Sequence, residues 1–357
     1  MKPELRQVLV GAIGAVLLSA GAVVNAQEPS NKPFDENWWP TEWGADDKVG
    51  APNRTTPAIV LEAVKLVKQG KTATLGKLYA SDIPFFGPRM WHLTIPGTPT
   101  GGPFGVNQLV FHDELVHTQI GQVGTQFDGP GHIGVRTPKG DFFYNGRNRE
   151  DAYQRHGSNY VLGMGDLGVE FVAEKGFVCR GILLDAPAYK GMNPLPIPTA
   201  PDSPGIVSAD DVKGMLEKQG IDEPREGDCV FLYTGHGDLW KNSIWPTLSA
   251  EEKAERVKKF VSGEPGFGLS ACEYFAERKI ILTGGDTSAN DAQPVTDVEG
   301  GAVPCHTEMQ ARRGIWNIEN LDFEPLLKDG VYEFLFVWAP LKMVGATGSP
   351  GNPVALY

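Results

Sequence analysis

The stretch Gly181-Ile182-Leu183-Leu184-Asp185 is short, apolar and uninterrupted, and three similar runs follow it at residues 230–233, 280–283 and 331–338. Amphipathic helical patterns separate these runs along the chain. Continuous apolar runs between such helices indicate strands that are covered on both faces. We therefore expect an α/β fold, with a mixed β core flanked by helices.

Signals for helix starts support this organisation. Thr56 followed by Pro57 predicts a helix that begins at the proline. Capping boxes predict three more helix starts, at Ser208 with Asp211, Ser249 with Glu252, and Ser270 with Glu273. Gly220 is expected to end the first of these three helices.

The chain shows no internal repeat and no convincing linker, so we expect one folded domain over residues 56–357. Residues 75–145 are strand-like pieces broken by Gly and Pro, with little helix. Residues 27–55 are rich in Pro, Asp, Asn and Trp without any period, which predicts an N-terminal arm. Trp38, Trp39 and Trp43 are expected to hold this arm against the domain by packing; the alternative is that they bind an aromatic ligand.

The first residues predict a secretory signal peptide over residues 1–26. Lys2 and Arg6 form a basic start, residues 8–24 are apolar, and Val24-Asn25-Ala26 offers a cleavage site before Gln27. The alternative is a membrane anchor, for which an apolar run of about 17 residues is short. We expect an exported protein, periplasmic or secreted, that does not remain in the membrane after signal cleavage.

The overall charge and the cysteines limit what the protein binds and how it is cross-linked. A net charge of −12 argues against nucleic acid and against anionic membrane surfaces, since both require basic patches. Cysteines at positions 179, 229, 272 and 305 could form two disulfides by three connectivities. Free buried thiols are the alternative, and the sequence does not decide between them.

The segment with the most side chains that could bind a metal or transfer protons is residues 122–132, Gln-Val-Gly-Thr-Gln-Phe-Asp-Gly-Pro-Gly-His. Residues two apart on an extended backbone project to the same side, so Gln126 and Asp128 can point jointly at one cation. His132 arrives from beyond the turn. Such oxygen and nitrogen donors suit Zn²⁺ or Mn²⁺. The alternative is that Asp and Gln in a glycine-rich loop only satisfy their own backbone.

This segment resembles the metal motif of the cyclase family, which includes bacterial kynurenine formamidases (arylformamidases) and isatin hydrolases. The motif runs His-x-Gly-Thr-His-x-Asp-x-Pro-x-His, and the chain matches it at Gly124, Thr125, Asp128, Pro130 and His132. The resemblance extends from about residue 40 to about residue 345 and includes the core runs at 180–185, 227–235 and 284–287. His306 and Glu319 resemble the family's distal histidine and glutamate.

The resemblance implies a swivelling β/β/α-type cyclase fold, a homo-oligomer, and a divalent ion, Zn or Mn, held by Asp128, His306, Glu319 and Gln126. It also implies hydrolysis of an amide or lactone bond in a small, often aromatic molecule. His132, as an imidazole with an ordinary pKa of about 6.5, is expected to act as acid and base in this reaction. Gln122 and Gln126 replace the first two histidines of the motif. Amide oxygen binds zinc more weakly than imidazole, which favours one ion, or a harder ion such as Mn²⁺.

Two further functions fit the same resemblance: a non-catalytic exported protein that binds a small molecule, and a metal-dependent lyase or cyclase. Substrate-binding residues are predicted from aromatic side chains and from a histidine that follows a core strand, namely Trp91, Phe104, Tyr144 and His236. Core packing is the alternative for all of them. For Asp286, after another core strand, we expect a structural role.

Overall fold

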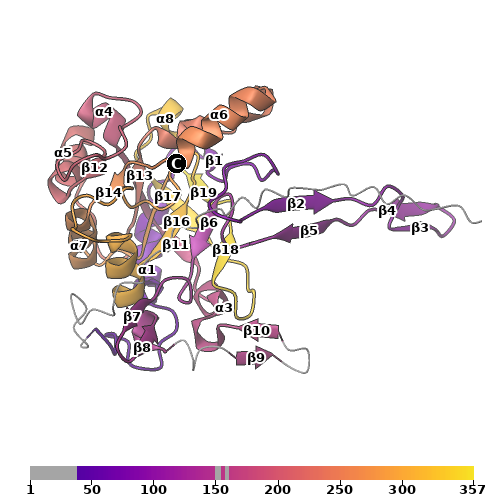
Figure 1. The fold of residues 1–357 in the computed structure, drawn as a ribbon, viewed down its shortest axis with the longest axis horizontal. Helices are drawn as coiled ribbons and strands as arrows, with labels where there is room; N and C mark the ends of the chain where they lie inside the picture. The colour runs from indigo at the N-terminus through magenta and orange to yellow at the C-terminus, as the bar shows by residue number, and fades with distance from the viewer. Residues whose placement is uncertain (1–37, 149–153, 157–160) are drawn as a thin grey trace, which may run out of the picture.

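The structure is a computed structural model that describes residues 38–148, 154–156 and 161–357. The predicted signal peptide and the first part of the N-terminal arm, residues 27–37, lie outside the described residues. The described chain is a mixed α/β protein built around a curled nine-stranded sheet (Figure 1). Its strands lie in the order β1-β19-β17-β11-β13-β15-β16-β6-β18.

The strands of this sheet, in chain order, are β1 (Thr72–Thr74), β6 (Gln126–Asp128), β11 (Phe177–Asp185), β13 (Cys229–Tyr233), β15 (Leu282–Gly285), β16 (Trp316–Glu319), β17 (Glu333–Trp338), β18 (Gly348–Pro350) and β19 (Val354–Leu356). The α-helices are α1 (Pro57–Val64), α3 (Val169–Ala173), α4 (Ala186–Lys190), α5 (Ala209–Gln219), α6 (Ala250–Phe260), α7 (Leu269–Glu277) and α8 (Glu324–Asp329). Two-stranded pairs complete the fold: β2 (Trp91–Thr94) with β5 (Leu115–Thr118), β3 (Gly101–Phe104) with β4 (Leu109–Phe111), β7 (Val135–Thr137) with β8 (Gly140–Phe142), β9 (Gln154–His156) with β10 (Val161–Gly163), and β12 (Ile206–Val207) with β14 (Gly266–Phe267).

The centre of the sheet confirms the expected buried strands. Strands β11, β13, β15 and β16 run parallel to one another, and every residue of β13 and β15 is buried. Phe231 of β13 packs its ring 4.7 Å from Phe336 and 5.9 Å from Phe334, both on β17. Burying one such aromatic side chain contributes about 1.5–3 kcal/mol. The sheet is therefore the hydrophobic core on which the polar site rests.

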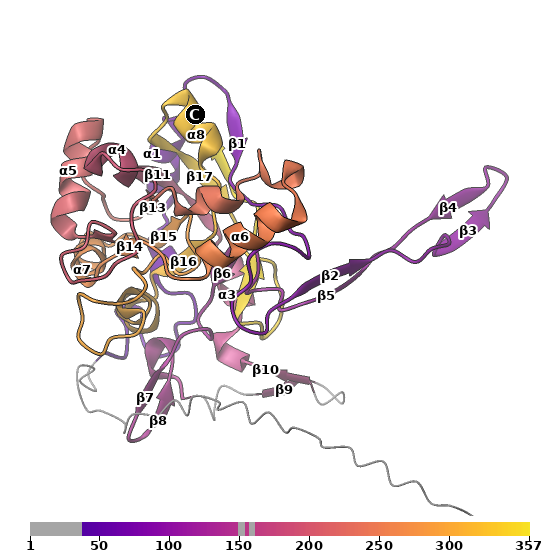
Figure 2. The same ribbon diagram turned by 45° about the horizontal axis from the view of Figure 1, so that its top comes forward.

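Most of the predicted helix ends are confirmed. Thr56 caps α1 at Pro57, Gly220 ends α5 in the left-handed conformation, and both the Ser208 and the Ser249 capping boxes are formed. Helices α4, α5 and α7 lie together along one side of the sheet in both views (Figures 1 and 2).

The prediction of the third capping box, at Ser270 with Glu273, is wrong. Helix α7 begins at Leu269, so Ser270 lies inside its first turn, and the Ser270 hydroxyl instead accepts a hydrogen bond from the backbone of Ala209 at 3.2 Å. The Leu269 amide donates at 2.9 Å to the carboxylate of Asp297, 28 residues further along the chain. A distant carboxylate therefore satisfies the helix start that Ser270 was expected to cap.

Two disulfides decide between the alternatives that the sequence left open. Cys179 is bonded to Cys229, which joins the neighbouring strands β11 and β13. Cys272 is bonded to Cys305, which ties α7 to the residue directly before His306. All four cysteines are buried. Disulfides of this kind persist in oxidising compartments, such as the periplasm or the extracellular space.

The described part of the N-terminal arm packs against the domain as expected. Trp38 is buried, Trp39 stacks on Phe142 at 5.1 Å, and Trp43 packs against the hydrophobic core of the domain. None of the helices in the described ranges combines the length and apolar character that crossing a bilayer requires.

Residues 91–118 form a feature that we call the long hairpin. Strands β2 and β5 pair at its base and β3 and β4 pair at its tip, all antiparallel. In both views it extends away from the rest of the molecule (Figures 1 and 2). The sequence predicted short strands in this region but not that they leave the body of the domain.

Candidate metal centre

The candidate site is built on two adjacent antiparallel strands, β6 and β16. Gln126 lies opposite Glu319 and Asp128 lies opposite Asn317. Because side chains alternate along a strand, all four project from the same face of the sheet. Phe127, between two of them, projects from the other face, where its ring packs 5.0 Å from that of Trp338. The same register therefore buries an aromatic side chain and gathers four polar ones.

The loop before β6 is tied to the end of β16. The Thr125 hydroxyl donates to the Asn320 carbonyl at 2.7 Å, and the Asn320 amide donates to the Gly124 carbonyl at 2.9 Å. Gly124 has φ of +63°, and a Cβ placed there would lie 2.6 Å from the Tyr79 ring. The Gly-Thr pair of the motif thus has a structural role, which is to bring Gln126 and Asp128 to Glu319.

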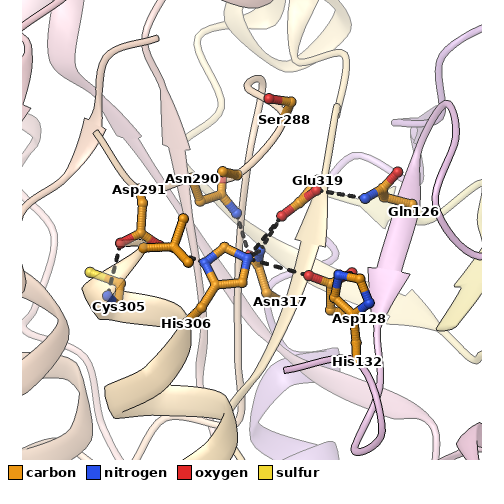
Figure 3. Close-up of polar contacts among 12 residues, drawn as sticks. Gln126, Asp128, His132, Ser288, Asn290, Asp291, Cys305, His306, Asn317 and Glu319 are labelled. Carbon is orange, nitrogen blue, oxygen red and sulfur yellow. Dashed lines mark hydrogen bonds and ion pairs between the residues drawn. The ribbon is translucent and has the colours of Figure 1, made fainter. Parts of the chain in front are cut away.

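His306 enters the same face from the start of a π-helical segment, η7 (His306–Ala311). Its Nε2 lies 3.3 Å from Asp128 Oδ2 and 3.2 Å from Glu319 Oε1 (Figure 3). Its Nδ1 lies 2.6 Å from the carboxylate of Asp291. Metal-binding histidines commonly hold their second ring nitrogen against a carboxylate in this way, which fixes the ring and leaves the other nitrogen for the ion.

Asp128, His306 and Glu319 form the group of potential metal ligands. One ligand atom from each lies within 4.8 Å of the others, and all three residues are buried. The donor set, two carboxylates and one imidazole nitrogen, suits zinc or manganese. The residues present therefore fit a divalent ion.

Sequence comparison assigns the family. Residues 41–292 match the family model described as putative cyclase. The chain belongs to the cyclase family. No curated protein matched the chain. Among solved structures, a novel cyclase is similar at 28% identity and a TM-score of 0.72, with 92% of this chain and 100% of that chain covered. The family and fold expected from the sequence are thereby confirmed.

More distant structures share the fold. An isatin hydrolase bound to the product analogue thioisatinate has 16% identity and a TM-score of 0.54, with 85% of this chain and 99% of that chain covered. Isatin hydrolase A from Labrenzia aggregata, bound to benzyl benzoate, has 16% identity and a TM-score of 0.52, with 80% and 93% covered.

Both glutamines of this cyclase motif contact the ligand group. The Gln126 amide donates to Glu319 Oε2 at 2.8 Å and to Gln122 Oε1 at 3.3 Å. The Gln122 amide donates in turn to Asp128 Oδ1 at 3.2 Å. The first two histidine positions of the motif therefore hold neutral amide side chains that orient the two carboxylates.

The two carboxylates differ in their electrostatic environment. Burial and the neighbouring Asp128 charge raise the pKa of Glu319 to about 8. Burial would also raise the pKa of Asp128, but His132 and His306 outweigh it and lower that pKa to about 2. Ionising both carboxylates in a buried site is costly unless a positive charge lies beside them. Hydrogen bonds to Asp128, Asp291 and Glu319 outweigh burial and raise the pKa of His306 well above its usual value, so this imidazolium, or a divalent ion in its place, could supply that charge.

His132 lies at the edge of this group. Its Nε2 is 3.6 Å from Asp128 Oδ1, and 22% of its side chain remains exposed. Burial lowers the pKa of His132 below its usual value, although Asp128 opposes this shift. A neutral imidazole beside a carboxylate can accept a proton and hold it as imidazolium.

One cavity of about 580 Å³ brings the predicted metal and catalytic residues together. Gln126, Asp128, His132, His306 and Glu319 all line it. Its apolar wall consists of Phe86, Ile133, Val261, Ala289, Pro294 and Val303.

The four predicted substrate-binding residues do not line this cavity. Trp91 packs 5.0 Å from the Tyr79 ring, and Phe104 lies far out on the long hairpin. Tyr144 is fully buried and donates to Asp47 at 2.7 Å. His236 is buried and bonded to the Phe260 carbonyl at 3.1 Å. Trp91, Tyr144 and His236 therefore make the contacts expected of residues that pack in the domain, whereas the Phe104 ring is exposed.

Sequence reasoning missed several residues of the site. Asn317 donates to Glu319 at 2.8 Å, and its position two residues before Glu319 on a strand could have revealed it. Asp291 lies in a loop 15 residues before His306, where no local pattern identifies it. Asp286 has the structural role expected, because it accepts backbone hydrogen bonds from Thr234 and Gly237.

Proposed function

We propose that this protein is a metal-dependent hydrolase that cleaves an amide or lactone bond of a small molecule with an aromatic or otherwise apolar body, as a kynurenine formamidase (arylformamidase) does. One observation carries the proposal: the buried group of Asp128, His306 and Glu319 lines the same cavity as His132 and an apolar wall. Isatin hydrolases with the same fold make a cyclic amide a reasonable alternative substrate.

We propose one ion, Zn²⁺ or Mn²⁺, held by Asp128, His306 and Glu319, with the Gln126 amide beside it. When bound, the ion would lower the pKa of a water molecule and polarise the scissile carbonyl. Asp291 keeps the His306 ring oriented, and Asn317 and Gln126 keep the Glu319 carboxylate oriented.

His132 is the proposed acid and base. Its lowered pKa keeps the imidazole neutral at pH 7, so it can take a proton from the attacking water and later donate it to the leaving amine or alkoxide. Asp128, 3.6 Å from the ring, stabilises the imidazolium that forms in between. The apolar wall of the cavity holds the body of the substrate and excludes bulk water.

Two measurements test this function. Protein purified without chelator is analysed for its metals, and the loaded protein is then incubated with N-formylkynurenine and with isatin in ¹⁸O-labelled water. The hydrolase proposal predicts about one divalent ion per chain and ¹⁸O in the product. Binding of ligands without metal or turnover would favour a non-catalytic binding protein, and turnover without ¹⁸O would favour a lyase or cyclase.

We also propose that the chain is exported, to the periplasm or outside the cell. The two disulfides support this, because they persist in oxidising compartments. Intact-mass measurement of protein from the exporting host tests it: cleavage before Gln27 is expected, and a retained 1–26 segment would contradict it.

The long hairpin supports a further proposal, that the protein is a homo-oligomer. Nine large apolar side chains between Leu93 and Val116 are each more than two-fifths exposed. A two-stranded hairpin is marginally stable without a partner. Burying these side chains would remove several hundred Å² of apolar surface, a large part of the about 800 Å² per partner in a stable interface. Because no Lys or Arg lies between Arg89 and Arg136, an anionic membrane is a poorer partner than a second copy of the chain.

A further inference from the structure

The cavity of the candidate metal centre contains a positive charge that the proposed mechanism does not use. Arg89 lines the cavity and is half-buried. It is the only lysine or arginine among the residues that line this cavity in the described chain. Its charge is close enough to His132 to contribute to the lowering of the His132 pKa.

Each carboxylate that lines the cavity already has its own partners. Asp128 is paired with His306 at 3.3 Å, and Glu319 accepts hydrogen bonds from Gln126 and Asn317. Glu264 accepts hydrogen bonds from the backbone amide of Ser288 at 2.9 Å and from that of Ala289 at 2.7 Å.

Arg89 is not one of these partners. No hydrogen bond or ion pair joins its guanidinium to any residue in the described ranges, whereas other half-buried cations of this chain are paired, such as Lys190 with Asp211 at 2.9 Å. A guanidinium offers five N–H donors and stays positively charged in proteins, because its pKa lies above 12. Its donors are therefore available to a ligand in the cavity.

The backbone holds Arg89 at this position. The amide of the next residue, Met90, donates to the Gln119 side chain at 2.9 Å, which closes the base of the long hairpin. Trp91 packs on Tyr79, and the preceding Phe86 packs 6.3 Å from the Phe260 ring. Contacts on both sides thus fix the backbone position of Arg89, while its guanidinium makes no hydrogen bond or ion pair with the described residues.

We propose that Arg89 binds a free carboxylate of the substrate, so that the substrate class is a small amide or lactone that carries a carboxylate in addition to the bond to be cleaved. This inference rests on the proposed function and names the substrate class of the same site. A planar guanidinium binds a carboxylate through two parallel hydrogen bonds, and the apolar wall would contact the body between the two polar ends. A neutral amide would leave Arg89 without a partner.

A matched pair of probes tests this. N-formylanthranilate has a formamide and a carboxylate on one ring, and formanilide is the same ring and formamide without the carboxylate. Binding of each is measured by calorimetry on metal-free and zinc-loaded full-length protein. Metal-free protein is essential, because a carboxylate could otherwise bind the zinc directly. Arg89→Gln removes the charge, Arg89→Lys keeps it without the planar fork, and Arg136→Gln removes an exposed arginine that pairs with Asp141 outside the cavity.

We expect the parent protein to prefer N-formylanthranilate by roughly 10–100-fold in both metal states, as for a charge-assisted hydrogen-bonded pair. Arg89→Gln should abolish this preference, Arg89→Lys should keep part of it, and Arg136→Gln should keep all of it. Equal binding of the two probes by the parent, or an unchanged preference in Arg89→Gln, would overturn the inference. Zinc content separates the two proposals. If the parent protein binds zinc but does not prefer N-formylanthranilate, the role of Arg89 is contradicted and the hydrolase proposal is not. If the parent shows the preference but binds no zinc, the hydrolase proposal is contradicted and the role of Arg89 is not.

Discussion

The two disulfides allow a controlled test of how the metal centre is positioned. Both pairs are buried, but only Cys272–Cys305 lies next to the site. Cys305 directly precedes His306, and its backbone amide donates at 2.8 Å to Asp291, the same carboxylate that holds His306. Replacing Cys272 and Cys305 by alanine should therefore disturb the ligand geometry, whereas replacing Cys179 and Cys229 should not.

The stability cost should be nearly the same for the two pairs. The bridges close loops with sequence separations of 33 and 50. Loop-closure entropy predicts a loss of about 4 kcal/mol in the free energy of unfolding for either one, since the cost grows only with the logarithm of loop length. Each double variant also removes two buried sulfur atoms, so the loss of stability caused by the cavity left behind should be similar in the two variants. The Cys179/Cys229 variant is thus a control matched in stability.

The affinity for zinc should separate the two variants. We expect zinc binding roughly tenfold weaker in the Cys272/Cys305 variant, at the lower end of the 10–100-fold range for loss of an outer-shell contact. The Cys179/Cys229 variant should bind zinc like the parent. The assays are denaturant unfolding and a competitive zinc titration, both under conditions where each variant is folded. Equal zinc affinities in the two variants would refute the idea that Cys305 positions His306.

Four further outcomes are expected. Gln126→His should keep or strengthen zinc binding and Gln126→Ala should weaken it less than Asp128→Ala does, because a neutral ligand contributes less than an anionic one; parent-like binding in both Gln126 variants would leave Gln126 a structural role. His132→Ala should keep its metal and lose turnover by roughly 10²–10⁴-fold, and loss of metal would make His132 a ligand instead. Burial lowers the pKa of His236 to about 4, so between pH 6.5 and pH 4 the unfolded chain binds a proton at this residue that the folded chain does not. The free energy of unfolding of the parent should therefore fall by about 3 kcal/mol relative to that of His236→Gln as the pH is lowered through this range. Free energies of unfolding that change in parallel with pH in the two proteins would contradict this. Phe104→Ser with Phe111→Ser should dissociate the proposed oligomer in sedimentation experiments, while Leu341→Ser with Val344→Ser, similarly exposed but outside the long hairpin, should not; a monomeric parent would end the proposal.

The sequence predicted the core well because core burial leaves a local pattern. The apolar runs that became β11, β13, β15 and β17 could be recognised without any knowledge of their neighbours. Two of the three predicted capping boxes, each a local pattern of two residues three apart, are formed. The third failed because Asp297 reaches Leu269 from a distant loop, and no local pattern contains that information.

The site was predictable only in part, and for a similar reason. Asp128 was identified from its spacing to Gln126, but His306 and Glu319 were identified only through resemblance, since no local spacing joins residue 128 to residue 306. The aromatic residues Trp91, Phe104 and Tyr144 lie outside the cavity, and an aromatic side chain has no sequence signature that separates a pocket from a core or a protruding hairpin. Arg89 was missed because its importance depends on what does not contact it, which only a structure can show.

The strand register explains why this site is compatible with glutamines at the first two histidine positions of the motif. Sliding β6 by one residue along β16 would turn Gln126 and Asp128 to the opposite face and bring Phe127 to the site. Phe127 and Ile318 are both completely buried on that opposite face. Such a slip would therefore move the large apolar side chain of Phe127 out of the core and bury the polar side chains of Gln126 and Asp128 in it. Packing on one face of the sheet thus fixes the arrangement of the potential metal ligands on the other. The glutamines at 122 and 126 can replace imidazoles without loss of this arrangement, because the register, rather than the identity of the two side chains, determines where Asp128 meets Glu319 and His306.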